Sequence, residues 1–391
     1  MSAPLEGIIV IDFTRLIAGP SATDLLASLG ARVIKVESVG GDPMRYMRSK
    51  EGGSGPSSPT FNAYNTLKQS IVLDLKDESD REVALALSAR ADVVVETFRP
   101  GVMERLGLGP SAIRALNPGV VYASLSAFSA SGSMATRGGV DIVMQAESGL
   151  MSVTGEMGGG PLKVGVPIVD AAAGYALALG IVAALVGRAR TGEGDDVTVS
   201  MLDVGVHLQA QTMAEFLATG TAPVRVGNCA PYAAPADVYP TAKGDLVLSA
   251  HLPEHWRRLC RLLDAPALFD DPRFIDTEHR VAHRDELSQV LTEALSTRTA
   301  GEWVELLSAE GLTAGEIRSY ADVMASSDVV EHETIAAAAN VDNSSLTVVR
   351  SPLRFRGWSD QTLTRKVPRL DEHGVEVRAF AIDPEALDSS R

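Results

Sequence analysis

The sequence predicts an α/β protein with a large Rossmann-like domain, built on a parallel sheet, and a smaller α+β domain. Strand and helix patterns alternate through the first half of the chain, as in a parallel sheet that helices cover on both faces. A segment rich in Ala, Pro and Gly follows at residues 221–236 and predicts a crossing linker. The length of 391 residues exceeds the roughly 250–300 residues that one hydrophobic core usually serves.

The chain opens with a strand, a turn, a helix and a second strand. We expect strands over residues 7–13 and 31–37, with a small-residue turn at 18–20 and a helix ending at Leu29 between them. Further strands are expected at 70–75, 92–96 and 120–126, and a helix at 78–89. These elements form the predicted parallel sheet and its cover.

The apolar stretch 171–187 is near the lower length limit for a membrane span. It consists largely of Ala and Gly and lies between Asp170 and Arg188, so we expect a buried core helix. A strand at 197–200 and one helix from 202 to about 218 follow.

The segment after the linker predicts the smaller domain. A strand pair at 238–239 and 246–250 precedes helices at 253–263, 284–295 and 300–310. The end of the chain, including a strand at 346–350, is expected to return to extended and loop structure.

Composition indicates which classes of partner the protein can bind and in which cellular compartment it is expected. The formal net charge of -15 argues against nucleic acid and against an anionic membrane surface, because both need a basic face. The two cysteines, Cys229 and Cys260, cannot form a disulfide framework. The first residues lack the cationic and apolar runs of a secretory signal. We therefore expect a cytoplasmic protein whose anionic ligands, if any, bind in a local cationic pocket.

The first turn excludes a dinucleotide site. A Rossmann phosphate turn needs the pattern G-x-G-x-x-G, whereas residues 14–20 read TRLIAGP, with one glycine and a proline that lacks a donor. No nicotinamide or flavin cofactor is expected. His207 and His251 are isolated and the cysteines are unpaired in sequence, so no metal site is expected either.

A set of ordered motifs spans nearly the whole chain. They read VIDFT at 10–14, AGP at 18–20, GARVIKVE at 30–37, GD at 41–42, SIVLDLK at 70–76, FRPG at 98–101, RLG at 105–107, NP at 117–118, GLMSVTG at 149–155, TGEG at 191–194 and DPRF at 271–274, together with Asp141 and Asp170. The set resembles the class III (family III) CoA-transferases, which include formyl-CoA and carnitine CoA-transferases.

The resemblance implies a specific architecture. A large CoA-binding domain would combine residues 1–222 and 331–391, and residues 223–330 would form the small domain with its linkers. Two subunits would interlock like links into a homodimer.

The resemblance also makes Asp170 the catalytic aspartate, a nucleophile that carries covalent intermediates between acyl-CoA and carboxylic acid substrates. Asp170 precedes the apolar helix, whose N-terminal amides favour an anion. Without the family, a helix N-cap would be the more ordinary role for an aspartate there. Residues 157–160 are a candidate lid or an ordinary turn, and the amides near Ala18 are candidate oxyanion donors.

Coenzyme A enters as a substrate, with no other cofactor implied. Its candidate contacts carried over from the family are Ile17, Ala18, Leu73, Lys76, Thr97, Phe98, Arg99, Arg105, Arg137, Val140 and Asp141. Surface charge is the alternative role for Lys76, Arg99 and Arg105.

Two other functions remain open from the sequence. α-Methylacyl-CoA racemases resemble these transferases but have a histidine where Val140 stands, and racemisation needs two acid/base groups. A non-catalytic acyl-CoA-binding protein is the third hypothesis. For the transferase, a small mono- or dicarboxylate such as succinate is expected, and Arg15 or Arg137 would suit a second carboxylate.

Overall fold

The computed structural model describes residues 2–48, 57–360 and 363–383. The chain divides into two compact units. The first, the sheet unit, comprises Met1–Leu150, Lys163–Thr221 and Val330–Arg391, and the second, the small unit, comprises Met151–Leu162 and Ala222–Val329. Residues 151–162 were predicted to belong to the large domain. Hydrogen bonds from the Arg225 side chain to Gly159 O and from Gly227 N to Gly155 O tie this piece to the small unit instead.

The described part of the sheet unit contains one sheet of six parallel strands, in the order β3-β2-β1-β4-β5-β6. These strands are β1 (Ile9–Asp12), β2 (Arg32–Glu37), β3 (Lys68–Val72), β4 (Val93–Glu96), β5 (Val121–Ser126) and β6 (Asp196–Ser200). The order reverses between β1 and β4, the place where open α/β sheets bind ligands at the carboxyl ends of their strands. The predicted mixed α/β fold with a parallel sheet is confirmed.

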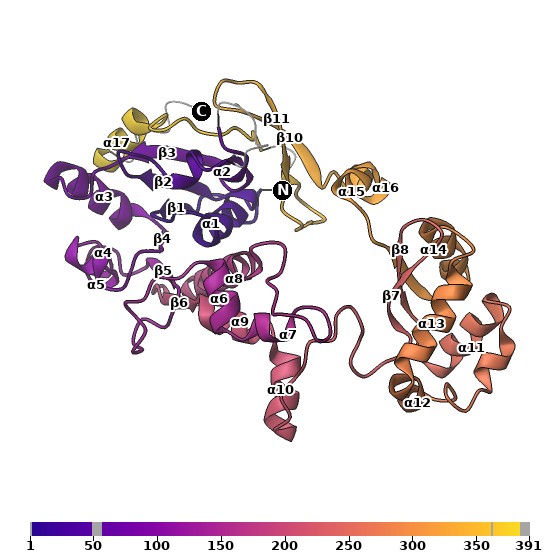
Figure 1. Cartoon of the computed structure of the whole chain (residues 1–391). Coiled ribbons are helices and arrows are strands. Elements are labelled where there is room, and N and C mark those ends of the chain that lie inside the picture. Colours follow the sequence, from indigo (N-terminus) through magenta and orange to yellow (C-terminus); the bar gives the residue numbers. More distant parts are fainter. Residues whose placement is uncertain (1, 49–56, 361–362, 384–391) are drawn as a thin grey trace. The chain divides into compact units, whose positions relative to one another are not determined.

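Each face of the sheet has its own apolar core. On one face, Val93 and Val95 pack with helices α1 (Ala18–Ser28) and α8 (Ile168–Thr191). On the other, Val94 packs with α3 (Glu78–Arg90) and α17 (Gly374–Ile382). The alternation follows from the two-residue period of a strand, and the two layers can be followed in Figure 1.

Helix α8 is the apolar segment that the sequence analysis weighed as a membrane span. By length and composition alone it could cross a membrane, as core helices of soluble proteins also can. Its residues Ala173, Leu177 and Ile181 are fully buried in the core beneath the sheet. Gly174 lets α1 approach closely, because a Cβ there would lie 2.0 Å from Ser21 Oγ. One face of the helix is therefore part of the core, as expected, while Tyr175, Leu179 and Val186 on the remaining surface are exposed.

The small unit has an antiparallel sheet covered by helices. In its described residues the strand order is β7 (Ala236–Pro240), β8 (Asp245–Ser249) and β9 (Thr313–Glu316). The helices α11 (Pro253–Leu262), α12 (Thr277–Ala282), α13 (Arg284–Leu295) and α14 (Ala300–Ala309) accompany it. Trp256, Phe274 and Trp303 are buried in its core. This unit has the predicted α+β composition.

Two expected elements differ from the structure. The helix predicted over 202–218 is split into α9 (Met201–His207) and α10 (Ala210–Thr219). Buried Gln209 lies at the break, where its side-chain amide donates to Ser148 O and Gly205 O at 2.9 and 2.8 Å. The end of the chain was expected to lack a helix, yet α17 buries Val377, Phe380 and Ala381 against the sheet.

The remaining elements are short. They are α2 (Pro59–Ala63), α4 (Val102–Arg105), α5 (Pro110–Leu116), α6 (Asp141–Glu147), α7 (Leu150–Val153), α15 (Tyr320–Ala325), α16 (Ser327–Glu331), the 3-10 helices η1 (Pro43–Arg45) and η2 (Pro266–Phe269), and the hairpin of β10 (Ile335–Ala339) with β11 (Ser345–Val349).

Candidate active site

A pocket of about 530 Å³ opens at the carboxyl ends of β1, β4 and β5, where the strand order reverses. All of its lining residues belong to the sheet unit. They come from the turn after β1 (residues 15–19), the loop after β4 (97–100), the end of β5 (125–127) and the segment before and within α6 (135–143), with Asp170 and Met201. The pocket therefore occupies the position expected for a ligand site in this fold.

Eight of the twelve predicted site residues line this pocket. They are Ile17, Ala18, Thr97, Phe98, Arg99, Arg137, Val140 and Asp170. The structure does not place the other four, Leu73, Lys76, Arg105 and Asp141, among the described lining residues. Leu73 is buried in the core, and Lys76 and Arg105 are exposed elsewhere on the sheet unit. Gly19, whose turn was predicted to supply oxyanion donors, also lines the pocket, while Leu16 and Met201 line it but were not predicted. For Met201, its position directly after β6 could have indicated the site.

Asp170 is the third residue of α8, which begins three residues earlier than predicted. Pro167 occupies the N-cap position, so the helix-capping role that was open for Asp170 is wrong. The carboxylate of Asp141 takes that role instead. Its Oδ1 accepts hydrogen bonds from Val169 N at 2.8 Å and from Asp170 N at 3.2 Å. Asp141 thus binds the N-terminal amides of α8 directly beside the predicted nucleophile.

The environment of Asp170 alters its acidity. Burial and the nearby charge of Asp141 raise the pKa of Asp170 to about 7. Burial and the Asp141 charge both disfavour the ionised form of Asp170. Around neutral pH the carboxyl therefore titrates, and its ionised form is a stronger base than an ordinary carboxylate. Strongly perturbed acidity in a pocket is typical of a functional group.

The turn after β1 presents backbone donors to the pocket. Ala18 and Gly19 are the first residues of α1, and their amides have no hydrogen-bond acceptor among the described residues. Pro20 follows and has no N–H to offer. A side chain at Gly19 would clash, because its Cβ would lie 2.4 Å from Thr14 Cβ and 2.7 Å from Thr97 Cγ2. The glycine therefore permits the close approach of this turn to the loop after β4.

Cationic side chains surround the pocket in spite of the acidic composition. Arg15, Arg99 and Arg137 line it. The Arg15 guanidinium lies 5.4 Å from the centre of the Phe98 ring, and that of Arg137 is paired with Glu147 at 2.6 Å. These groups make a local site for an anionic ligand.

A second pocket of about 460 Å³ adjoins the first. Both are lined by Phe98, Arg99, Pro100 and Ser126. Glu96 lies in the second pocket, and burial raises its pKa to about 7. Among the described residues, no group of three or more His, Cys, Asp or Glu side chains could hold a metal ion.

Comparison with known families identifies the family to which the chain belongs. A sequence model of CoA-transferase family III matches residues 5–374. The chain belongs to CoA-transferase family III. The resemblance inferred from the ordered motifs is thereby confirmed, and the protein is an enzyme of this type.

Relatives of this CoA-transferase align over almost its full length. The probable fatty acyl-CoA transferase Rv3272 of Mycobacterium tuberculosis is 38% identical, with 95% of this chain and 96% of the relative covered. The acetyl-CoA:oxalate CoA-transferase of Acetobacter aceti is 36% identical, with 98% and 97% covered. The succinate–glutarate CoA-transferase of Agrobacterium fabrum is 34% identical, with 96% and 95% covered.

Solved structures agree with the fold of this CoA-transferase. The crystal structure of Rv3272 from M. tuberculosis superposes with a TM-score of 0.85 at 37% identity, covering 96% of this chain and 99% of that one. A CAIB/BAIF family protein from Brucella suis gives a TM-score of 0.86 at 32% identity, with 97% and 100% covered.

Proposed function

We propose that this enzyme moves coenzyme A between two carboxylic acids through covalent intermediates on Asp170. One observation carries the proposal: among the described residues that line the pocket, Asp170 is the only carboxylate. Its pKa is raised, three arginines line the same pocket, and the Ala18 and Gly19 amides at the start of α1 have no acceptor among the described residues. A carboxylate in such a site can attack a thioester and divide one transfer into easier steps.

The proposed steps conserve atoms and charge. The Asp170 carboxylate attacks the acyl-CoA carbonyl, forming a mixed anhydride and releasing CoA thiolate. The thiolate then attacks the aspartyl carbonyl, forming an aspartyl-CoA thioester and releasing the donor carboxylate. The acceptor carboxylate attacks this thioester, giving a new mixed anhydride and thiolate. Finally, the thiolate attacks the acceptor acyl carbonyl, producing the new acyl-CoA and restoring Asp170.

Each attack places negative charge on a carbonyl oxygen. We assign the stabilisation of this charge to the amides of Ala18 and Gly19, because preorganised backbone donors perform this role in acyl transfer. We assign Arg99 and Arg137 to the phosphates of CoA, and Ile17, Thr97 and Phe98 to its pantetheine arm. This assignment uses the residues that line the pocket.

We assign no part of CoA to four other residues, which stay predicted contacts: Leu73, Lys76, Arg105 and Val140. For Asp141 we propose an indirect role through the first turn of α8, because its carboxylate binds the amides of Val169 and Asp170.

Racemisation is less well supported by the pocket. A racemase needs a second acid/base group opposite the first. At the position of the racemase histidine the pocket has Val140, and its described lining includes no histidine, cysteine, lysine or tyrosine. A passive acyl-CoA binder would have no need for a carboxylate with raised pKa beside the thioester.

We propose a small mono- or dicarboxylate, such as succinate, as an acid substrate. Similar enzymes are named for oxalate, for succinate and glutarate, and for mesaconate, and Arg15 offers a pocket cation for a second carboxylate. We further propose that the enzyme acts in the cytoplasm as an interlocked homodimer.

Trapping of the covalent intermediate tests this function. The enzyme is incubated with succinyl-CoA or acetyl-CoA alone and then treated with borohydride or hydroxylamine. We expect an acyl-CoA-dependent modification in the peptide that contains Asp170, because the first half-reaction needs no acceptor. Asp170→Asn should abolish the modification, and the exposed control Asp195→Asn should keep it. Persistent turnover without modification at Asp170 would rule out the aspartyl mechanism.

A further inference from the structure

The turn between β1 and α1 is held in a conformation that its sequence does not favour. Leu16 has a φ of 68°, in the left-handed region that branched and bulky residues rarely adopt. Its side chain is 41% exposed, so burial of the leucine itself does little to offset this strain. Strained residues persist where surrounding contacts hold them, and they cluster at functional sites. The contacts that hold Leu16 therefore bear on the pocket.

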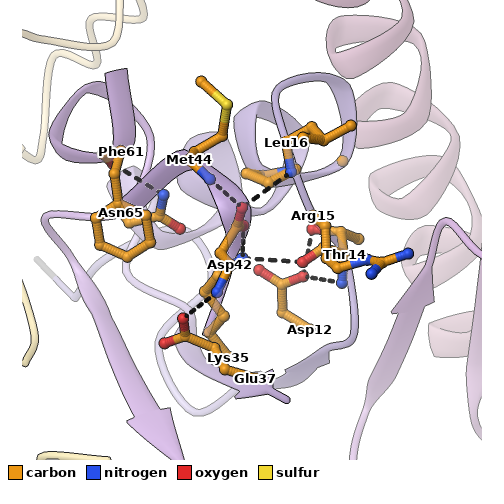
Figure 2. A network of polar contacts seen from close by, with 12 residues as sticks. Asp12, Thr14, Arg15, Leu16, Lys35, Glu37, Asp42, Met44, Phe61 and Asn65 are labelled. Atoms are coloured by element: carbon orange, nitrogen blue, oxygen red, sulfur yellow. Dashed lines mark hydrogen bonds and ion pairs between the residues drawn. The ribbon is translucent and has the colours of Figure 1, made fainter. Parts of the chain in front are cut away.

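A single ion pair holds both ends of this turn (Figure 2). Lys35 Nζ donates to Thr14 O at 2.9 Å and lies 3.0 Å from Asp42 Oδ2. Asp42 Oδ1 accepts a hydrogen bond from Leu16 N at 3.4 Å. Thr14 and Leu16 flank Arg15, so the pair binds backbone atoms on both sides of Arg15.

Strand β2 and the residues after it place the pair. Lys35 lies within β2. Asp42 follows a turn at Gly41, whose φ of 73° suits a glycine. The carboxylate of Glu37, at the end of β2, accepts from Asp42 N at 3.0 Å and from two nitrogens of the Arg45 side chain. The segments 30–37 and 41–42, which the proposed function leaves without a role, thus build the support of the turn.

A second ion pair fixes the neighbouring backbone. Asp12 Oδ1 accepts from Thr14 N at 2.8 Å. Lys68 Nζ lies 3.0 Å from Asp12 Oδ2 and donates to Pro20 O, in the first turn of α1, at 3.0 Å. This pair holds the turn at Thr14 and α1 at Pro20, whereas Asp42 contacts Leu16 itself and Lys35 binds both Asp42 and Thr14 O.

Stability alone does not account for the Lys35–Asp42 pair. Both side chains are fully buried. Burying two charges costs desolvation energy, and apolar residues of similar volume are often as stabilising or more so. Buried polar pairs can instead select one conformation. Within the described chain neither side chain lines the pocket, so an effect on the reaction has to pass through the turn.

We propose that Lys35 and Asp42 are positioning residues, which hold Leu16 in its left-handed conformation and thereby place the Ala18 and Gly19 amides for the thioester carbonyl. The inference rests on the proposed transfer function. According to this inference, the ion pair affects the donors near the thioester and not the contacts with the rest of CoA. Loss of the pair should therefore lower the turnover number more than the affinity for CoA.

Two variants separate positioning from simple stabilisation. Lys35→Met leaves a buried, unpaired carboxylate and should lower the midpoint of thermal unfolding. Lys35→Met/Asp42→Leu removes both charges and also the acceptor for Leu16 N, and the apolar replacement should restore part of the midpoint. Both variants should turn over about tenfold or more slowly, with the Kd for CoA, from calorimetry, within about threefold of wild type.

The control is an ion pair near the opposite ends of the strands. Arg188 and Asp92 lie 2.9 Å apart, and Asp92 directly precedes β4. Arg188→Met/Asp92→Asn should change the unfolding midpoint but leave the turnover number near that of wild type. Wild-type turnover by the double variant of Lys35 and Asp42 would overturn the proposal, because the pair would then serve stability only.

Hydrogen exchange supplies a readout that does not depend on turnover. Amides of residues 14–19 should exchange faster in Lys35→Met/Asp42→Leu than in wild type or in the control variant. Unchanged exchange there would also overturn the positioning role. Absence of CoA transfer by the wild-type enzyme would count against the proposed function, while the exchange result would still decide the inference.

Discussion

Replacement of Asp170 by Asn is expected to stabilise the protein at alkaline pH while abolishing transfer. The folded-state pKa of Asp170 is about 7, above its ordinary value of 3.8. Between these values the folded protein retains a proton that the unfolded chain releases. The contribution of this group to the free energy of unfolding therefore falls as the pH rises from about 4 to about 7, and stays low above that range.

The magnitude follows from the same two values. The difference from 3.8 to about 7 is roughly three pH units, and about 1.4 kcal/mol per unit gives an upper limit of about 4 kcal/mol. Asp170 is only partly buried, at the edge of an open pocket, so solvent screening reduces this figure. Loss of the favourable interaction between a carboxylate and the helix N-terminus removes about 0.3–1 kcal/mol more. We expect a gain of about 1–2 kcal/mol at pH 8.

Urea unfolding of wild type and Asp170→Asn at pH 4, 6 and 8 measures this gain. It should be near zero at pH 4 and grow through pH 6 to pH 8, and the variant should show no transfer at any of these values. Asp195→Asn, at an exposed carboxylate directly before β6, is the matched control and should show no such trend. A gain that is independent of pH, or a loss at pH 8, would refute the assignment of a raised pKa.

Three further outcomes are expected. For the wild-type enzyme, kcat/KM should rise with pH through about 7 as Asp170 ionises, and a flat profile from pH 5.5 to 8.5 would contradict this role. Asp141→Asn keeps an acceptor for the amides of α8 but removes a charge that raises the pKa of Asp170. The acid limb of the pH profile should therefore move to lower pH, and an unmoved limb would exclude an effect of the Asp141 charge on Asp170. Gly19→Ala would place Cβ 2.4 Å from the Thr14 side chain and should lower the turnover number about tenfold or more. Gly187→Ala, with open space around its Cβ, should keep activity and gain up to about 1 kcal/mol of stability.

The fold was predictable where a residue pattern is compatible with only one kind of secondary structure. The continuous apolar run at 93–95 and the small-residue turn at 18–20 indicated a buried strand and a strand–helix unit. The split of α9 from α10 was not predictable, because the Gln209 amide bonds to Ser148 O, 61 residues away in sequence. Local patterns contain no information about such contacts.

The candidate site was predicted through the ordered motifs more than through composition. Asp170 was identified by that set, whereas its position near a helix start favoured an ordinary cap, a role that the structure gives to Asp141. Leu73 and Lys76 follow β3, at the sheet edge two strands away from β1, and a motif does not reveal this separation. The strain at Leu16 also gave no signal, because leucine marks no particular turn.

The division of the chain has a consequence for its synthesis. The sheet unit uses residues from both ends, with the small unit inserted as two pieces. Helix α17, near the end of the chain, covers a sheet face that includes Ile11 and Ile34 from the first two strands. While the ribosome makes the intervening residues, that apolar face lacks part of its cover, a state that favours aggregation or chaperone binding. A stop codon before residue 374 would make this exposure permanent, although every residue lining the pocket would already have been synthesised.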